Sequence, residues 1–228
     1  MLKIEHLSKS YKKKKVLDDI SYEFENMVYV LLGENGAGKT TLLRCITGVM
    51  RHYSGSVSTD EIGADQNKAD KVSIGYVPQN FGTYYNLTVK ETLEYISLLK
   101  EIDNMDEAVD RSLMMVHLED IKDQKVKTLS GGMIRRLGIA QAILDEPEIL
   151  IMDEPTVGLD PKERRDFFER LQELDFSGTI LISTHILDDV SKIADKALAL
   201  INGKIVELPW KKGDTDLEDK YLCLLGEI

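Results

Sequence analysis

The chain has 228 residues, 43% of them hydrophobic and 30% charged, with a formal net charge of −11 at pH 7. This length suits one large domain or two lobes that share a core. The acidic balance argues against a protein that grips a nucleic-acid backbone over a broad face. The two cysteines and four scattered histidines lack the spacing of a disulfide framework or a structural zinc site, so Cys45 and Cys223 are expected to be reduced and partly buried.

No stretch approaches the roughly 18 consecutive apolar residues of a membrane span. The N-terminus, MLKIEHLSKSYKKKK, lacks the apolar core of a secretory signal, which favours a location inside the cell. Short strands are predicted at 2–7 and 16–24, and the basic run Lys12–Lys15 between them is expected to be a solvated turn.

The apolar run MVYVLLG at 27–33 is typical of a strand buried on both faces, as in a parallel sheet. A helix is predicted to follow it over 40–50. Its buried face is defined by four apolar positions: Leu42, Leu43, Ile46 and Val49. Residues 51–71 are polar and irregular. The next strand, at 72–79, closes at Pro78, because proline cannot donate to a central ladder.

The pattern over 88–118 is strongly helical. Buried strands are predicted again at 148–154 (EILIMDE) and 179–184 (TILIST). The segment KALALINGKIVEL, 196–208, predicts a hairpin that turns at Asn202-Gly203. Strands that alternate with helices at these spacings indicate an α/β fold with a largely parallel sheet.

The helical block interrupts this alternation without a Gly/Ser/Pro linker, so we predict a single domain. An α/β core that includes a β subdomain would comprise residues 1–85 and 146–210. The inserted helical lobe would comprise 86–145. A charged tail with a short helix at 216–225 would comprise 211–228.

Residues 33–40 match the phosphate-loop pattern G-x-x-x-x-G-K-[ST], between a predicted strand and a predicted helix. Glycines allow successive backbone N–H groups to face phosphate oxygens, and the following helix adds its positive end. Lys39 would reach the β- and γ-phosphates, and the Thr40 hydroxyl would bind Mg²⁺. Kinases, GTPases and motor ATPases share this loop, so the loop alone leaves the reaction open.

Asp153 and Glu154 follow the apolar strand ILIM. An aspartate at this end of a strand beside a phosphate loop can hold Mg²⁺ through water, and the next residue can polarise an attacking water. By itself the pair could equally cap the strand in an acidic turn. Ser130, Gly131 and Gly132 stand before an apolar-periodic helix, which indicates either an ordinary capped helix or a second anion site.

Together these motifs resemble those of the ATP-binding subunits of ABC transporters, over about residues 1–207. GENGAGKTT is similar to the Walker A motif of that family, ILIMDE to its Walker B motif, and LSGGM to its signature, which is usually LSGGQ. VPQN, GLD and STH are similar to its Q-loop, D-loop and switch histidine. The resemblance implies a P-loop NTPase (RecA-like) core with an N-terminal antiparallel β subdomain and an inserted helical lobe.

The resemblance also implies ATP and Mg²⁺ as cofactors, bound where two such subunits close head to tail. The ATP-binding residues of one subunit would be Tyr11, stacked on adenine, and Gly33, Glu34, Asn35, Gly36, Ala37, Gly38, Lys39, Thr40 and Thr41. The signature acting on the ATP of the other subunit would be Leu129, Ser130, Gly131, Gly132 and Met133. The metal would be held by Thr40, Gln79 and Asp153.

Under the same resemblance Glu154 would be the general base, His185 would contact the γ-phosphate, and Asp160 would lie at the dimer face. Each of His185, Tyr11 and Gln79 also has an ordinary structural interpretation. Three aromatic side chains could pack in the core or form part of a docking groove: Phe81, Tyr84 and Tyr85.

We therefore expect an ATPase that drives a separate transmembrane permease from the cytoplasmic side of the membrane, as a homodimer or with a paralogue, and without nucleic acid. Met133 removes an amide found in the usual signature, but the backbone donors remain. FGTYYNLTVKETLEYI and DEPTVGLDPKER resemble exporters (ABC-2-like) more than importers. The alternatives are a soluble ABC ATPase of DNA repair or translation, and a regulatory cassette that binds ATP without hydrolysis, which the intact Glu154 and His185 disfavour.

Overall fold

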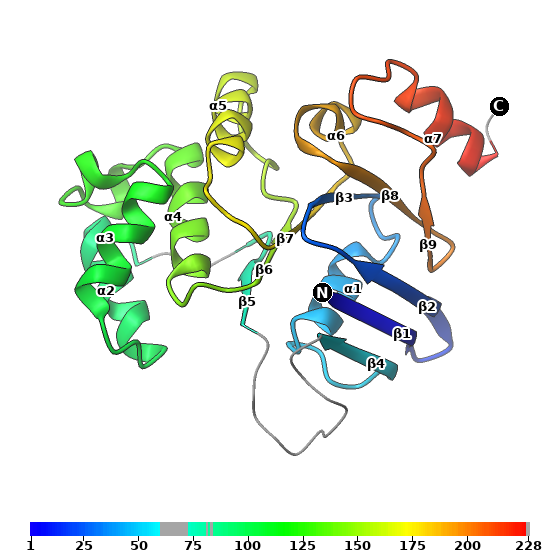
Figure 1. Ribbon diagram of the computed structural model, residues 1–228, viewed down its shortest axis with the longest axis horizontal. Helices are drawn as coiled ribbons and strands as arrows, with labels where there is room; N and C mark the ends of the chain where they lie inside the picture. Colours follow the sequence, from blue (N-terminus) through cyan, green and yellow to red (C-terminus); the bar gives the residue numbers. More distant parts are fainter. Residues whose placement is uncertain (60–72, 81, 83, 227–228) are drawn as a thin grey trace. The chain divides into compact units, whose positions relative to one another are not determined.

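The structure is a computed structural model that describes residues 1–59, 73–80, 82 and 84–226. Phe81 and most of the predicted irregular segment 51–71 lie outside the described residues. The chain forms two compact units (Figure 1). Unit 1 comprises residues 1–72, 151–154 and 177–228, and unit 2 comprises residues 73–150 and 155–176.

Unit 1 contains an antiparallel sheet and a mostly parallel one. The antiparallel sheet has the order β2-β1-β4, formed by β1 (Leu2–Tyr11), β2 (Lys14–Phe24) and β4 (Ser54–Thr59). The other sheet contains β3 (Val28–Leu32), β6 (Ile149–Asp153, which begins in unit 2), β7 (Thr179–Thr184), β8 (Lys196–Ile201) and β9 (Lys204–Glu207). The helices of this unit are α1 (Lys39–Ile46), α6 (Leu187–Ile193) and α7 (Leu217–Leu225). The predicted α/β class with an N-terminal antiparallel sheet is confirmed.

Strand β3 lies between β7 and β8 and runs parallel to both. The register pairs Val28 with Ile180 and Leu32 with Thr184, so β3 and β7 end at the same edge of the sheet. β3 is a continuous apolar run and β7 is apolar over 180–182, as expected of strands that are buried on both faces. The segments that follow Leu32 and Thr184 therefore emerge side by side.

Helix α1 ends at Ile46, four residues before the predicted end at Met50. Gly48 has a left-handed backbone with a φ of 70°, which stops the helix, and the Met50 N–H donates to the Arg44 carbonyl over 2.8 Å. Val49, predicted on the buried face, is 65% exposed. The predicted helix was too long because the apolar periodicity of the sequence extends to Val49, three residues beyond the end of α1.

Strands β1 and β2 are longer than predicted, and only Lys12 and Lys13 form the turn between them. Their extensions contain only polar residues and Tyr11, and each of these is half-buried or exposed, which is why the sequence pattern did not reveal them. The two cysteines also differ from each other. Cys45 in α1 is buried, and burial raises the pKa of its thiol, whereas Cys223 in α7 is exposed rather than partly buried.

The hairpin of β8 and β9 turns at Asn202-Gly203, as predicted. Asn202 has a φ of 49° and Gly203 a φ of 77°, the pair of left-handed residues that matches the twist of a two-residue hairpin. The Gly203 carbonyl accepts from the Asp18 N–H over 2.8 Å, which joins this turn to β2.

Unit 2 is mainly helical. Its elements are β5 (Ile74–Val77), α2 (Val89–Leu99), α3 (Met105–Met115), two short 3₁₀ helices (Glu119–Ile121 and Val126–Thr128), α4 (Gly131–Ile143) and α5 (Pro161–Gln172). Thr88 and Glu91 form a capping box at the start of α2, because each side chain bonds to the backbone of the other. The boundaries 86–145 given for the helical lobe stay a prediction.

None of the helices in the described ranges is long and apolar enough to cross a membrane.

We expect Gly203→Ala to destabilise the protein more than Gly213→Ala. Both glycines have a positive φ, so either alanine carries a left-handed backbone cost of about 1–2 kcal/mol. A Cβ at Gly203 would also lie 2.9 Å from the Val16 carbonyl oxygen, whereas Gly213 faces open space. In urea unfolding, the free energy of unfolding of Gly203→Ala should be lower than that of Gly213→Ala by about 1 kcal/mol or more. Equal free energies of unfolding would contradict a close approach at this turn.

Candidate nucleotide-binding site

The predicted phosphate loop connects β3 to α1 in unit 1, and two of its glycines are required by the backbone. Gly38 caps α1 with a φ of 109°, and a Cβ there would lie 2.8 Å from Val16 Cγ1. Gly36 has a φ of 85°. The Ala37 N–H donates to the Glu34 carbonyl over 3.1 Å, which closes the turn. The loop thus leads directly into the N-terminus of α1, where free N–H groups favour an anion.

Lys39 is the first residue of α1, and its side chain is only 4% exposed. The ammonium donates to the Gly33 carbonyl over 2.6 Å and to the Glu34 carbonyl over 3.2 Å. It also lies 3.1 Å from Glu154 Oε1. A buried ammonium is stable only with such partners, and here they are the loop itself and one carboxylate.

Glu154 follows β6 and lies between two of the other predicted residues. Its Oε1 faces Lys39, and its Oε2 lies 3.2 Å from His185 Nδ1. The Glu154 side chain is 9% exposed and the His185 side chain 38% exposed, so the cluster opens to solvent on the histidine side. The structure thus brings together Lys39, Glu154 and His185, which the sequence places far apart.

Asp153, the last residue of β6, is fully buried. Its Oδ1 accepts from the Ser183 hydroxyl over 2.7 Å. Its Oδ2 is also buried, and no hydrogen-bond partner for it occurs among the described residues. An unpaired buried carboxylate oxygen is costly in a folded chain, and it suits a site that holds a cation or its water.

Ser183 and Thr184 precede His185 in the STH motif, and both hydroxyls have defined partners. Thr184 donates to Asp189 Oδ2 over 3.1 Å and accepts from the Ile186 N–H over 3.0 Å, which orders the segment that carries His185. Sequence reasoning singled out only the histidine. The two hydroxyl residues before it, which follow the apolar run at 180–182, were the available signal.

These residues fit a nucleoside triphosphate with Mg²⁺. A helix N-terminus and a buried ammonium are suited to phosphate oxygens. Thr40 and Thr41 lie half-buried in the first turn of α1, where a hydroxyl can reach a metal ion. Asp153 Oδ2 is the unpartnered oxygen that a metal-bound water would use. The set of donors therefore matches the predicted cofactors.

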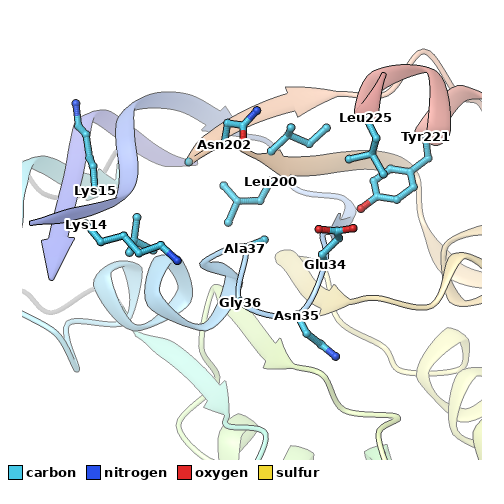
Figure 2. A pocket seen from close by; sticks show the side chains of 13 residues that line it. Lys14, Lys15, Glu34, Asn35, Gly36, Ala37, Leu200, Asn202, Tyr221 and Leu225 are labelled. Carbon is cyan, nitrogen blue, oxygen red and sulfur yellow. The ribbon is translucent and has the colours of Figure 1, made fainter. Parts of the chain in front are cut away.

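A cavity of about 580 Å³ lies beside the loop, within unit 1 (Figure 2). One wall consists of Asn35, Gly36 and Ala37, and the start of β2 forms another. Helix α7 contributes Tyr221 and Leu225, and Figure 2 shows Tyr221 and Glu34 on facing sides. The C-terminal helix, predicted from the sequence at 216–225 within a charged tail, thus borders the predicted ATP-binding residues.

Tyr11, predicted to stack on adenine, ends β1 and is 46% exposed. Its hydroxyl donates to Met50 Sδ over 3.3 Å, and the Lys9 ammonium lies 5.3 Å from the centre of its ring. The ring is available for stacking, and its contact with a base stays a prediction.

The signature residues lie at the start of α4 in unit 2. Leu129 is buried and Ser130 is the N-cap, whose Oγ accepts from the Met133 N–H over 3.3 Å. The Gly132 N–H donates to Glu163 Oε1 over 3.3 Å. The ordinary capped helix is therefore present, and a carboxylate already occupies part of its N-terminus. Sequence reasoning missed Glu163, because it lies 31 residues further along the chain.

Asp160 is the N-cap of α5, with Oδ1 accepting from the N–H groups of Lys162 and Glu163 over 2.9 and 2.8 Å. Glu163 Oε2 accepts in return from the Asp160 N–H over 3.4 Å. Glu163 thus contacts both the predicted D-loop and the signature. The position of Asp160 at a dimer face stays a prediction.

Gln79 belongs to unit 2, whereas the other predicted metal ligands, Thr40 and Asp153, belong to unit 1. The Gln79 carbonyl accepts from Arg135 Nη1 over 2.8 Å, and the Val157 carbonyl accepts from Arg135 Nη2 over 3.1 Å. Burial lowers the pKa of Arg135. This residue of α4, which the sequence analysis did not single out, joins the Q-loop segment to the segment before α5.

The strand, glycine-rich loop, buried lysine and paired acidic residues define the class: a P-loop nucleotide-binding protein. A sequence model of the family described as ABC transporter matches residues 17–157, and the chain belongs to this family as an ATP-binding subunit.

Relatives and solved structures agree with this family. The chain is 34% identical to the "Lantibiotic transport ATP-binding protein SrtF" of Streptococcus pyogenes, over 97% of this chain and 96% of that one. It is 36% identical to the "Linearmycin resistance ATP-binding protein LnrL" of Bacillus subtilis, over 95% and 70%. A solved ATP-binding subunit of an ABC transporter has a TM-score of 0.78 and 27% identity, over 99% of both chains. cbiO1 of Clostridium perfringens has a TM-score of 0.80 and 26% identity, over 99% and 94%.

We expect Asp160→Ala to lower the free energy of unfolding by about 1 kcal/mol, because it removes the N-cap of α5 and frees Glu163 from its capping box. Asp160→Asn is the matched control, since asparagine caps a helix about as well as aspartate. Urea unfolding measures both, and a loss of stability in Asp160→Asn equal to that in Asp160→Ala would contradict the capping role.

Proposed function

We propose that this chain binds and hydrolyses ATP as a head-to-tail dimer and thereby drives a separate membrane permease. The observation that carries the proposal is the position of Glu154, held between the buried Lys39 ammonium and the His185 ring. A carboxylate at the end of β6, next to the phosphate loop, can act as general base for an attacking water.

Lys39 would exchange its loop carbonyls for the β- and γ-phosphate oxygens when nucleotide binds. Mg²⁺ bound with the nucleotide would supply charge neutralisation on these phosphates. Thr40 and Asp153 would hold that ion, with Gln79 as a further contact. As Lys39 turns to phosphate, the Glu154 carboxylate would be released to accept a proton, and His185 would hold its orientation through Nδ1.

The second half of each site would be the signature of a second copy or of a paralogue. The Ser130 hydroxyl and the N–H groups of Gly131 and Gly132 would face the γ-phosphate. The Gly132 N–H must first leave Glu163, to which it bonds over 3.3 Å. Met133 is half-buried, and its N–H serves the cap, so the missing glutamine amide leaves the backbone donors in place.

Export is supported by the names of the relatives, one for lantibiotic transport and one for linearmycin resistance. The chain would act at the cytoplasmic face of the membrane through a permease made of a separate polypeptide. Tyr84 and Tyr85 are exposed, and the Tyr84 ring lies 4.9 Å from that of Tyr95. These residues of unit 2 could form part of the surface on which the permease docks.

We expect Glu154→Gln to lower ATP turnover by about 10²- to 10⁴-fold, the range for removal of a general base. ATP binding should persist, because the Lys39 ammonium loses a competing carboxylate and keeps its two loop carbonyls. Phosphate release gives the turnover, and size-exclusion chromatography with ATP should show a dimer that accumulates in this variant.

Glu148→Gln is the matched control for this experiment. Glu148 is exposed and directly precedes β6, the strand that Glu154 follows. Turnover in the control should equal that of the unmodified protein. Normal turnover in Glu154→Gln would exclude its role as general base, and failure of the unmodified protein to bind ATP would overturn the proposed function.

We expect the tagged chain to sediment with membranes and to co-purify in detergent with a protein that has several apolar segments of about 20 residues each. Density-gradient fractionation separates this outcome from the main alternative, an ABC ATPase of translation, which would sediment with ribosomes. RNase treatment is the control, since it would release a ribosome-bound chain and leave a permease complex intact.

A further inference from the structure

Ser183 lies in β7, fully buried, and contacts both acidic residues that end the neighbouring strand. Its hydroxyl donates to Asp153 Oδ1 over 2.7 Å and accepts from the Glu154 N–H over 3.0 Å. We propose that Ser183 is a positioning residue that sets the orientation of both carboxylates at once. The proposal rests on the proposed hydrolysis of ATP and adds a residue to it.

The first effect concerns which oxygen of Asp153 is available. Rotation of the carboxylate would exchange its two oxygens, but the bond from Ser183 fixes Oδ1. Oδ2 is then the oxygen left without a partner among the described residues. A hydrogen bond to a ligating carboxylate also fixes its direction and its basicity. Ser183 therefore leaves one defined oxygen, Oδ2, which would serve a Mg²⁺-bound water.

The second effect concerns the backbone of Glu154, which has a φ of 47°. This left-handed conformation is unfavourable for any residue that carries a side chain. The Glu154 N–H is held by Ser183 twice, by the carbonyl oxygen over 3.1 Å and by the hydroxyl over 3.0 Å. These bonds hold the turn in which the Glu154 carboxylate reaches Lys39 and His185.

The neighbouring Thr184 does not duplicate this role. Successive side chains of a strand point to opposite faces, and the Thr184 hydroxyl bonds to Asp189 and to the Ile186 N–H. Among the described residues, the Ser183 hydroxyl is therefore the single side-chain group bonded to both Asp153 and Glu154. Through this hydroxyl, a change in the orientation of the Asp153 carboxylate would alter the position of Glu154, the proposed general base.

The test is Ser183→Ala in the purified full chain. We expect kcat to fall by about 10- to 100-fold, the usual effect of losing a partner of a metal-binding group. The Mg²⁺ concentration for half-maximal rate should rise, while the KM for ATP at saturating Mg²⁺ stays nearly unchanged. A general loss of folding would reduce the active fraction and leave the Mg²⁺ dependence as it was.

Three variants serve as controls. Ser183→Thr keeps the hydroxyl and should recover much of the lost activity and of the Mg²⁺ dependence. Ser183→Cys keeps the size but is a weak donor and acceptor, so it should resemble Ser183→Ala. Ser97→Ala removes another buried hydroxyl, in α2, for which the described residues offer no partner, and it should change nothing.

A second readout does not depend on turnover. Electron paramagnetic resonance of Mn²⁺ at saturating ATP measures metal binding to each variant, and the Ser183→Ala protein with ATP bound should bind Mn²⁺ about 10- to 100-fold more weakly. Metal binding and Mg²⁺ dependence equal to those of the unmodified protein would overturn the role of Ser183. If the unmodified protein binds Mn²⁺-ATP but does not hydrolyse ATP, the proposed function fails while the binding comparison still decides about Ser183.

Discussion

The buried ion pair of Lys39 and Glu154, 3.1 Å apart, is the interaction on which the arrangement of the site depends. Two charges removed from water are stable only when their remaining hydrogen-bonding capacity is satisfied. Lys39 meets this condition through two loop carbonyls, which fixes the curvature of the glycine loop. The Glu154 carboxylate meets it through His185, and the bonds of the Glu154 backbone N–H to Ser183 of β7 fix where the residue lies. The parallel register of β3 and β7 brings these groups to one edge of the sheet.

This pair also bears on the proposed binding of phosphate. The Lys39 ammonium is buried and donates to the loop carbonyls, so a phosphate oxygen would replace existing oxygen partners instead of a water shell. The exchange involves little reorganisation, which is how preorganised charges contribute most to catalysis. Glu163 at the Gly132 N–H has a similar position in unit 2, where a carboxylate of the chain itself occupies a place suited to phosphate.

Much of the fold and the motif residues of the site could be predicted from the sequence, for a physical reason. Strands such as β3 are continuous apolar runs, and the loop at 33–40 has a spacing that few other structures require. Contacts between distant segments were not accessible in this way. Ser183 lies 29 residues from Glu154 along the chain, and the hydroxyl residues of β7 draw attention to themselves without indicating which distant groups they contact. The end of α1 was missed because Val49 continues the apolar period after the backbone has left the helix.

The C-terminal helix α7 has one further consequence, for spectroscopy. The chain has a single tryptophan, Trp210, which is buried just before this helix and donates from Nε1 to the Asp214 carbonyl over 3.4 Å. Lys220 of α7 pairs with Asp214 as well, over 2.8 Å, so the indole and the helix share one anchor. Tyr221, the next residue, lines the cavity beside the phosphate loop. All tryptophan fluorescence of this protein therefore originates from Trp210. The indole is a label-free reporter of the position of α7 beside the phosphate loop.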